Sequence, residues 1–168
     1  RASLVSVRRL EGQVIRAART AGRMLGKEVK VAFLGDAYLD ASIEKRLAPV
    51  LLHLVRNAVD HGIESESERE AVGKPAAGSV SVSVSQGDAD VEVVVRDDGA
   101  GIDVGRLRAK MGALDPRLAE LPESELINCI FRHGVSTREE VNELSGRGVG
   151  LDVVAEGVAA VGGRIELE

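Results

Sequence analysis

The stretch SVSVSVSQGDADVEVVVR, residues 79–96, decides the class of fold. Valines alternate with polar residues in its first half and recur in its second half, the period-two pattern of strands with one buried face. The polar sequence Gln-Gly-Asp-Ala between the halves predicts a turn, so the two strands should form an antiparallel hairpin. The valines expected on the buried face are Val80, Val82, Val84, Val91, Val93 and Val95.

Strand and helix patterns alternate on either side of this hairpin. EVKVAFLG, residues 28–35, has the alternation of another strand, and RIELE, residues 164–168, should begin one more. Apolar residues at helical spacing predict helices over residues 4–25, about 41–60 and 150–163. Interleaved elements that include a hairpin predict an α/β fold: a two-layer sandwich with a mixed sheet and three helices on one face.

Two segments lack a strong period. HGIESESEREAVGKPAAG, residues 61–78, is polar and predicts a loop with one helical turn. Residues 99–150 predict a long insertion with short helical pieces around Val104–Met111 and Ser124–Phe131. The length of 168 residues suits a single domain.

Composition excludes several classes of function. The net charge of −5 and an aromatic content of 2% argue against nucleic-acid binding. Cys129 is the only cysteine, which excludes an internal disulfide and a thiolate zinc site and suggests a reducing, cytoplasmic setting. No apolar run approaches the roughly 20 residues of a membrane helix. Because the chain begins with Arg1 and not methionine, we expect a fragment of a longer protein.

The predicted helix near residue 60 carries an unusual polar face. In LLHLVRNAVDHGIE, residues 51–64, His53, Asn57 and Asp60 stand at i, i+4 and i+7, and His61 follows at the helix end. These spacings place the first three side chains on one face. From these residues alone, a solvated stripe opposite the core explains the pattern as well as a functional site does.

A second polar cluster, DDGAGID at residues 97–103, follows the hairpin directly. Gly99 and Gly101 would let the backbone approach a ligand closely, and ionised carboxylates there can accept hydrogen bonds. A tight turn would also explain the glycines, but it does not require two aspartates before Gly-x-Gly. The cluster therefore favours a binding role.

The third cluster, SGRGVGLDVV at residues 145–154, is a glycine-rich loop that opens a helix. Backbone N–H groups at a helix N-terminus suit phosphate. Its spacing and context differ from those of a dinucleotide-binding turn and of a Walker loop. A carboxylate for the adenine amino group, a glycine loop for phosphates and an asparagine for Mg²⁺ together indicate a site for ATP and Mg²⁺.

These three motifs, in this order, resemble the N box and the two glycine boxes of the GHKL ATPases, the group of gyrase, Hsp90, MutL and histidine kinases. Asn-Ala-x-Asp-His-Gly-Ile-Glu, followed by GKP and a valine hairpin, resembles the kinase domain of CheA-like chemotaxis histidine kinases. The resemblance runs from about Arg16 to the end. It implies a single GHKL (Bergerat) ATP-binding domain over 1–168, with a leading helix at 1–26, an ATP lid at about 102–145 and its C-terminal strands missing.

The resemblance also implies roles for individual residues. Asn57 would coordinate Mg²⁺, and His53 would lie near the γ-phosphate. Both would be catalytic residues. Asp97, the first acid of Asp-x-Gly-x-Gly, would accept a hydrogen bond from the adenine amino group. The other implied nucleotide contacts are Asp60, His61, Gly99, Gly101, Ile102, Gly146, Arg147, Gly148, Val149 and Gly150.

The implied activity is transfer of the ATP γ-phosphoryl group to a histidine on a separate phosphotransfer domain, because His53, His61 and His133 fall in the nucleotide motif or the lid. Implied partners are a response regulator, a chemoreceptor and a coupling protein, and the parent protein would be a homodimer. The lid sequence FRHGVST, residues 131–137, has His133 and Val135 where the family usually has Pro and Phe. A GHKL nucleotide clamp or ATPase, or a degenerate noncatalytic docking module, are the alternative functions.

Overall fold

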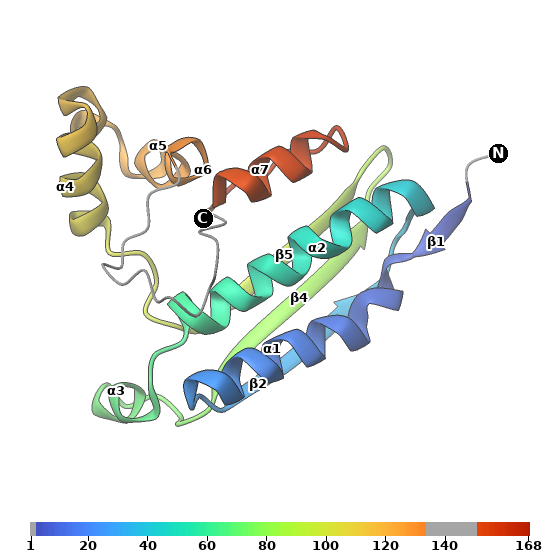
Figure 1. Cartoon of the computed structure of the whole chain (residues 1–168), viewed down its shortest axis with the longest axis horizontal. Helices are drawn as coiled ribbons and strands as arrows, with labels where there is room; N and C mark the ends of the chain where they lie inside the picture. The colour runs from blue at the N-terminus through green and yellow to red at the C-terminus, as the bar shows by residue number, and fades with distance from the viewer. Residues whose placement is uncertain (1–2, 134–150) are drawn as a thin grey trace. The chain divides into compact units, whose positions relative to one another are not determined.

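The computed structural model describes residues 3–133 and 151–168, in two compact units that divide between Gly101 and Ile102 (Figure 1). The first unit contains β1 (Leu4–Ser6), η1 (Val7–Leu10), α1 (Glu11–Leu25), β2 (Val29–Gly35), β3 (Tyr38–Asp40), α2 (Ala41–Asn57), η2 (Ala58–Gly62), α3 (Glu66–Ala71), β4 (Gly78–Gln86) and β5 (Val91–Asp97). The second contains α4 (Val104–Leu114), η3 (Pro116–Glu120), α5 (Glu123–Asn128), α6 (Ile130–His133) and α7 (Leu151–Ala159).

The main sheet of the first unit is mixed, as the hairpin predicted. Its strand order is β2-β4-β5, with β2 parallel to β4 and β4 antiparallel to β5. Val82 lies opposite Val95 on one side and opposite Phe33 on the other, so the alternating residues of three strands share one face. A separate antiparallel pair joins β1 and β3.

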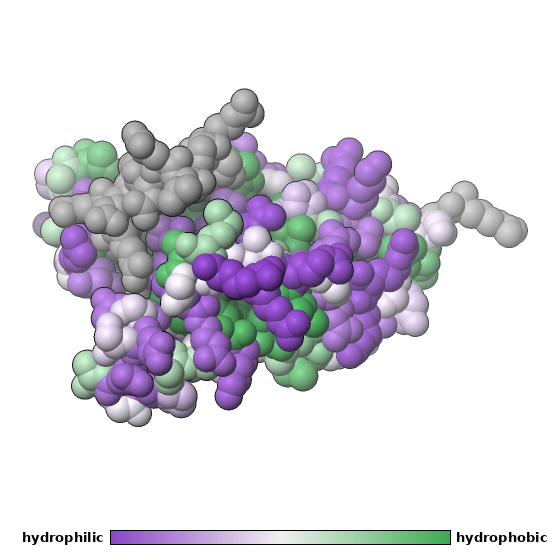
Figure 2. Space-filling model, turned by 60° about the horizontal axis from the view of Figure 1, so that its bottom comes forward, coloured by the Kyte–Doolittle hydropathy of each residue, from purple (hydrophilic) through white to green (hydrophobic). Residues whose placement is uncertain are grey.

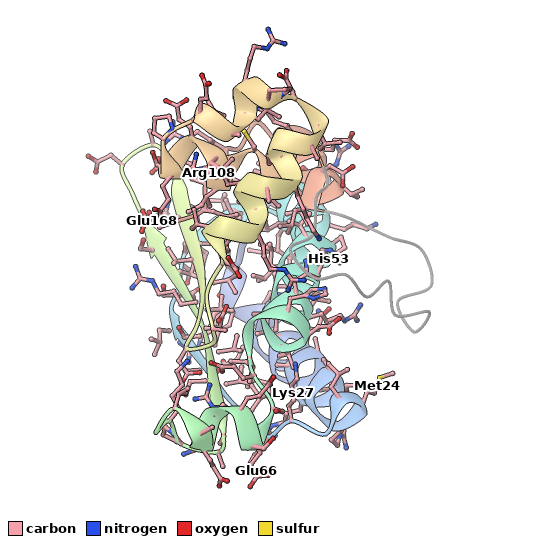
Figure 3. All side chains as sticks on the ribbon, turned by 90° about the vertical axis from the view of Figure 1, so that its left-hand side faces the viewer. Met24, Lys27, His53, Glu66, Arg108 and Glu168 are labelled. Carbon is pink, nitrogen blue, oxygen red and sulfur yellow. The ribbon has the colours of Figure 1, made fainter. Side chains whose placement is uncertain are left out.

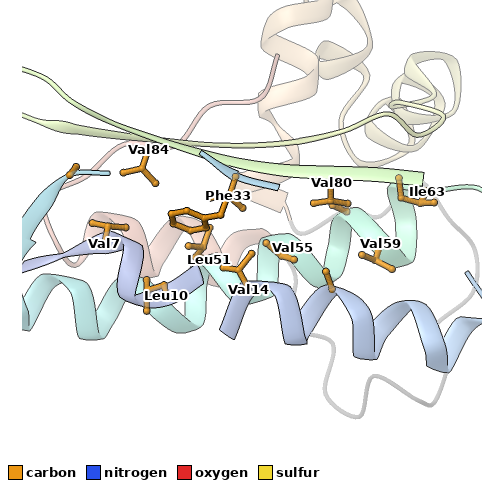
Figure 4. Packing of buried hydrophobic residues seen from close by; sticks show 14 residues of the cluster. Val7, Leu10, Val14, Phe33, Leu51, Val55, Val59, Ile63, Val80 and Val84 are labelled. Atoms are coloured by element: carbon orange, nitrogen blue, oxygen red, sulfur yellow. The ribbon is translucent and has the colours of Figure 1, made fainter. Parts of the chain in front are cut away.

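Helices α1 and α2 cover that apolar face, and the core fills the space between helices and sheet (Figure 4). Valine, leucine and alanine dominate this core, as expected for a chain with few aromatic residues. The buried members are Val7, Leu10, Val14, Ala18, Phe33, Ala37, Leu51, Val55, Ala58, Val59, Ile63, Val80, Val82 and Val84. The first unit is therefore a two-layer α/β sandwich.

The start of the predicted leading helix was wrong. Residues Leu4–Ser6 form a strand paired with β3, and a 3₁₀ turn precedes α1. Ser6 explains the change: its hydroxyl accepts a hydrogen bond from the Arg8 N–H and donates one to Asp36, which caps the turn at this point. The predicted end is confirmed, because Gly26 closes α1 in the left-handed region with φ 66°.

The second unit is helical and has its own buried cluster of Leu107, Met111, Leu126, Cys129 and Ile130. The short helical pieces expected near residues 104–111 and 124–131 are confirmed by α4, α5 and α6. The third predicted long helix corresponds to α7 in this unit. No helix within residues 3–133 and 151–168 combines the length and the hydropathy that a transmembrane helix requires.

The strand predicted at residues 164–168 does not form. The Leu167 N–H donates to Asn128 Oδ1 at 3.0 Å, and Asn128 Nδ2 donates to the Leu167 carbonyl at 3.4 Å. A side-chain amide thus occupies the backbone groups that a neighbouring strand would pair with.

Val82 tests the core, because it is fully buried in the central strand. We expect Val82→Ala to lower the free energy of unfolding by about 2 kcal/mol, since two buried methyl groups are lost and a cavity remains. Urea unfolding followed by circular dichroism measures this change. Ser85→Ala, at an exposed position of the same strand, is the control and should have little effect; equal effects of both changes would contradict the assigned core.

Candidate functional site

The polar residues of the α2 motif gather where that helix ends. Asn57 is its last residue, His53 stands one turn earlier, and both are partly buried (Figure 3). The next five residues, which contain Asp60 and His61, form the π-helical turn η2, closed by a 2.9 Å hydrogen bond from the Ile63 N–H to the Ala58 carbonyl. The prediction of one regular helix to residue 60 was therefore wrong in its last turn. Single π turns of this kind are frequent at functional sites.

Lys27 holds this π turn from outside the motif. Its Nζ donates to the Val59 carbonyl at 3.0 Å and to the Asp60 carbonyl at 2.8 Å (Figure 3). An ammonium group at the last carbonyls of a helix also interacts favourably with the helix dipole. Lys27 thus anchors the backbone that carries Asp60 and His61, whose own side chains approach within 3.6 Å.

Two glycines, Gly62 at the end of η2 and Gly99 just after β5, allow these two segments to approach closely. A Cβ on Gly62 would lie 2.8 Å from the Asp97 carboxylate carbon and from both of its oxygens, so that carboxylate sits directly over the Gly62 backbone. A Cβ on Gly99 would collide with the Gly62 carbonyl. The Ala100 N–H donates to that carbonyl at 3.1 Å. Two motifs 35 residues apart therefore meet in a backbone contact that only glycine allows at position 99, beside a carboxylate that fills the space next to Gly62.

The two adjacent aspartates of this cluster have different surroundings. Within the described part of the chain, the Asp97 carboxylate accepts one hydrogen bond, from the Gly99 N–H at 2.9 Å. The Asp98 carboxylate instead accepts from the Ser79 N–H and from Arg69 Nη2, each at 2.8 Å. An ionised carboxylate offers about four acceptor sites, so Asp97 retains capacity for a ligand while Asp98 serves the fold.

Arg69 connects the chain after η2 to the turn after β5. Its side chain is fully buried and donates to Glu64 at 2.9 Å, to Asp98 at 2.8 Å and to the Pro75 carbonyl at 2.7 Å. Lys74 donates to the same Glu64 carboxylate at 2.6 Å and to the Gly99 carbonyl at 2.9 Å. This four-residue charge network fixes the glycine turn that presents Asp97.

The network shifts the pKa of its members. Burial raises the pKa of Asp98, but the Ser79 N–H, the Arg69 guanidinium and the charge of Lys74 outweigh burial and hold it below its ordinary value of 3.8. Burial also raises the pKa of Glu64, but the hydrogen bonds from Lys74 and Arg69 outweigh burial and hold this pKa below 4.5. The hydrogen bond to Asp98, joined by that to Glu64, raises the pKa of Arg69 despite its burial. All three groups are therefore charged at neutral pH.

The structure brings some of the predicted site residues together. Asn57, Asp60 and His61 share the end of α2 and η2, and Asp97 and Gly99 lie against Gly62. Gly101 adopts φ 73°, which favours glycine. Ile102 packs against the buried cluster of the second unit. Gly146, Arg147, Gly148, Val149 and Gly150 lie outside the described residues.

Three cationic residues that support the site, Lys27, Lys74 and Arg69, were not predicted. Lys27 and Lys74 lie in the short sequences GKE and GKP, and these sequences were the only features that could have indicated a role for the two lysines. Arg69 had none, because it lies in a polar run interpreted as a loop. That run does contain the expected helical turn: α3 begins with a capping box between Ser65 and Glu68.

The sequence profile of the histidine kinase-, DNA gyrase B- and HSP90-like ATPases matches residues 42–168, more than half of the chain. The chain therefore belongs to this family, and the GHKL prediction is confirmed.

Comparison with individual proteins shows which members of the family are similar to this chain. The gliding motility regulatory protein of Myxococcus xanthus is 43% identical over 157 residues, which cover 89% of this chain and 20% of that protein. The chemotaxis protein CheA of Rhizobium meliloti is 38% identical over 157 residues, covering 90% and 20% respectively. A solved histidine kinase domain from Erythrobacter litoralis aligns with 20% identity and a TM-score of 0.41 over 72% of this chain and 51% of that one. The chain spans about a fifth of the length of the two curated relatives.

Arg69→Met tests the charge network. We expect it to lower the free energy of unfolding by roughly 2 kcal/mol, because the Glu64 and Asp98 carboxylates each lose a charge-assisted hydrogen bond from Arg69. Urea unfolding at neutral pH measures the loss. Arg96→Met, at an exposed position on β5, is the matched control and should change stability little. Equal stabilities of the two variants would contradict the role of the network.

The same network predicts a pH dependence. The depressed pKa values of Glu64 and Asp98 contribute stability that is fully present above their ordinary values of 4.5 and 3.8 and is lost as pH falls through the lower folded values. The stability difference between the wild type and Arg69→Met should therefore be constant near neutral pH and shrink below pH 4.5. A difference that persists unchanged to the acid limit of folding would contradict these shifts.

Proposed function

We propose that this chain is the ATP-binding catalytic domain of a CheA-like histidine kinase. It transfers the ATP γ-phosphoryl group to a histidine on a separate phosphotransfer domain. The observation that carries the proposal is the placement of the Asp97 carboxylate over Gly62, at the end of the helix that presents Asn57. Family membership and the CheA relatives support the same function.

The site residues would bind the two ends of the nucleotide. The Asp97 carboxylate accepts a hydrogen bond from the adenine amino group, which its spare acceptor capacity allows. His53 lies near the γ-phosphate, and Asp60 and His61 contact the nucleotide from η2. The remaining contacts come from Gly99, Gly101, Ile102, Gly146, Arg147, Gly148, Val149 and Gly150.

The donor set of α2 fits Mg²⁺. This ion usually takes few protein ligands and completes its shell with phosphate oxygens and water. Asn57 offers an amide oxygen at the helix end, and among residues 3–133 and 151–168 no cluster of three or more His, Cys, Asp or Glu offers a competing site. When bound, Mg²⁺ supplies positive charge to the phosphate oxygens. The chain itself orients the nucleotide, since phosphoryl transfer depends mainly on positioning and charge.

The wider proposal concerns organisation and partners. The chain forms one GHKL domain in which residues from about 102 to 145 act as the ATP lid. Its acceptor histidine belongs to another domain of the parent protein, and a response regulator receives the phosphoryl group afterwards. The parent protein is a cytoplasmic homodimer that a chemoreceptor and a coupling protein control. The CheA relatives are the support for these partners.

A transfer assay tests the function. The chain is mixed with the phosphotransfer domain of its parent protein and γ-labelled ATP, and label on the acceptor histidine is counted. We expect transfer by the wild type and a loss of about 100-fold in Asn57→Ala, because the Mg²⁺ ligand that organises the phosphates is removed. Ser85→Ala, at an exposed position of β4 outside the proposed site, is the control and should retain transfer.

The other outcomes separate the alternatives. Release of free phosphate without a labelled acceptor would indicate an ATPase clamp and contradict the kinase. Nucleotide binding without either reaction would indicate a noncatalytic docking module. Unchanged transfer in Asn57→Ala would contradict the assignment of Asn57.

A further inference from the structure

Helix α1 presents a row of arginines that the proposed nucleotide site does not use. Arg16, Arg19 and Arg23 follow one another at helical spacing, and all three are exposed. Within the described part of the chain, none of them makes an ion pair, whereas Arg8 pairs with Glu11 at 3.2 Å. Figure 2 turns the face of α1 toward the viewer, and hydrophilic side chains extend along it.

These arginines border a hollow of about 430 Å³ between α1 and the start of β2. Its lining combines the apolar side chains of Ile15 and Val29, both partly buried, with the charged groups of the arginines, Lys27 and Glu28. An apolar floor with an arginine rim is typical of protein interfaces, which are enriched in arginine and depleted of lysine.

The stability of α1 does not explain this arrangement. Like charges at i, i+3 and i, i+4, as in Arg16–Arg19 and Arg19–Arg23, weaken a helix by a few tenths of a kcal/mol per pair. The charge is also segregated: residues 1–30 contain eight Lys or Arg and two Asp or Glu, a net +6, and because the chain carries −5, the other 138 residues carry −11. An unpaired basic surface on an acidic chain is suited to an anionic partner.

The position of the hollow relates it to the proposed site. Lys27 lines the hollow, and its Nζ bonds the Val59 and Asp60 carbonyls of η2. A molecule held at the arginine row therefore lies beside the end of the helix that presents Asn57 and His53. The phosphoryl acceptor is the partner that must reach this end of the unit.

We propose that the arginine row of α1 and its hollow dock an acidic surface of the phosphoacceptor domain. Arg16 to Arg23 spans about 10 Å, two turns of a facing acidic helix, and guanidinium groups bind carboxylates through paired hydrogen bonds. The low aromatic content and the net negative charge of the chain disfavour a nucleic acid as the occupant. This inference rests on the proposed kinase function.

Charge reversal tests the docking surface. The double variant Arg19→Glu/Arg23→Glu is compared with Lys45→Glu/Arg46→Glu, which makes the same charge change at exposed positions of α2. We expect the first to raise the KM for the phosphotransfer domain at least about tenfold, with kcat and the ATP Kd unchanged, because only docking is weakened. Added NaCl should raise the KM of the wild type, because it screens the attraction, and should not raise that of the variant, whose reversed charges repel the acidic partner. A KM equal to that of the control would overturn the proposal.

Two further measurements distinguish a failure of the docking proposal from a disturbed helix and from a failure of the proposed kinase function. Arg19→Gln/Arg23→Gln removes the two positive charges without adding negative charge to α1, so it should raise the KM by a smaller factor than the reversed pair. No rise in KM for a folded Gln variant would overturn the docking site. Binding of poly-L-glutamate is measured without any reaction, so it tests the surface even if the wild type transfers no phosphate. Wild type should bind it and the reversed variant should not. Preferential binding of anionic lipid vesicles or DNA over poly-L-glutamate would overturn an acidic protein as the partner.

Discussion

The close contact between Gly62 and the turn after β5 is the constraint on which the candidate site depends. The Asp97 carboxylate lies over the Gly62 backbone, and the Gly62 carbonyl accepts the Ala100 N–H. A side chain at Gly99 would collide with the Gly62 backbone and push η2 and β5 apart, and one at Gly62 would displace the Asp97 carboxylate. Since Asn57 stands at one side of this contact and Asp97 at the other, the separation between the proposed metal ligand and the proposed adenine ligand depends on the close approach that Gly99 allows and on the Asp97 position that Gly62 allows.

Charged groups outside the motifs maintain this contact. Lys27 binds the carbonyls of η2 from the end of α1, and Arg69 and Lys74 bind the glycine turn from the segment before β4. Arg69 is fully buried and donates to two carboxylates, so its removal takes a charge-assisted hydrogen bond from each of them. The same residues therefore stabilise the fold and set the geometry of the site. Of the two aspartates, Asp98 belongs to the charge network, and Asp97 keeps acceptor capacity for a ligand.

Local patterns in the sequence predicted most of the fold of the first unit. The valine alternation predicted the β4–β5 hairpin and its buried face, and the apolar spacing predicted α2 up to Asn57. The errors occurred where a distant residue decides the local conformation. Leu4–Ser6 is a strand because β3 lies beside it, η2 is a π turn anchored by Lys27, and Leu167 pairs with Asn128. For the site, the motifs predicted Asp97 and Asn57, but the roles of Arg69 and Lys27 depend on contacts that no spacing encodes.

The most direct test of the account is the preference for the adenine amino group. Dissociation constants for ATP and for inosine triphosphate, which lacks that amino group, can be compared by calorimetry for the wild type, Asp97→Asn and Asp98→Asn. If Asp97 accepts the amino hydrogen, the wild type and Asp98→Asn should bind ATP at least about tenfold more tightly than inosine triphosphate. Asp97→Asn should lose or reverse this preference, because an amide can also donate. Equal binding of both nucleotides by the wild type, or an unchanged preference in Asp97→Asn, would contradict the central claim.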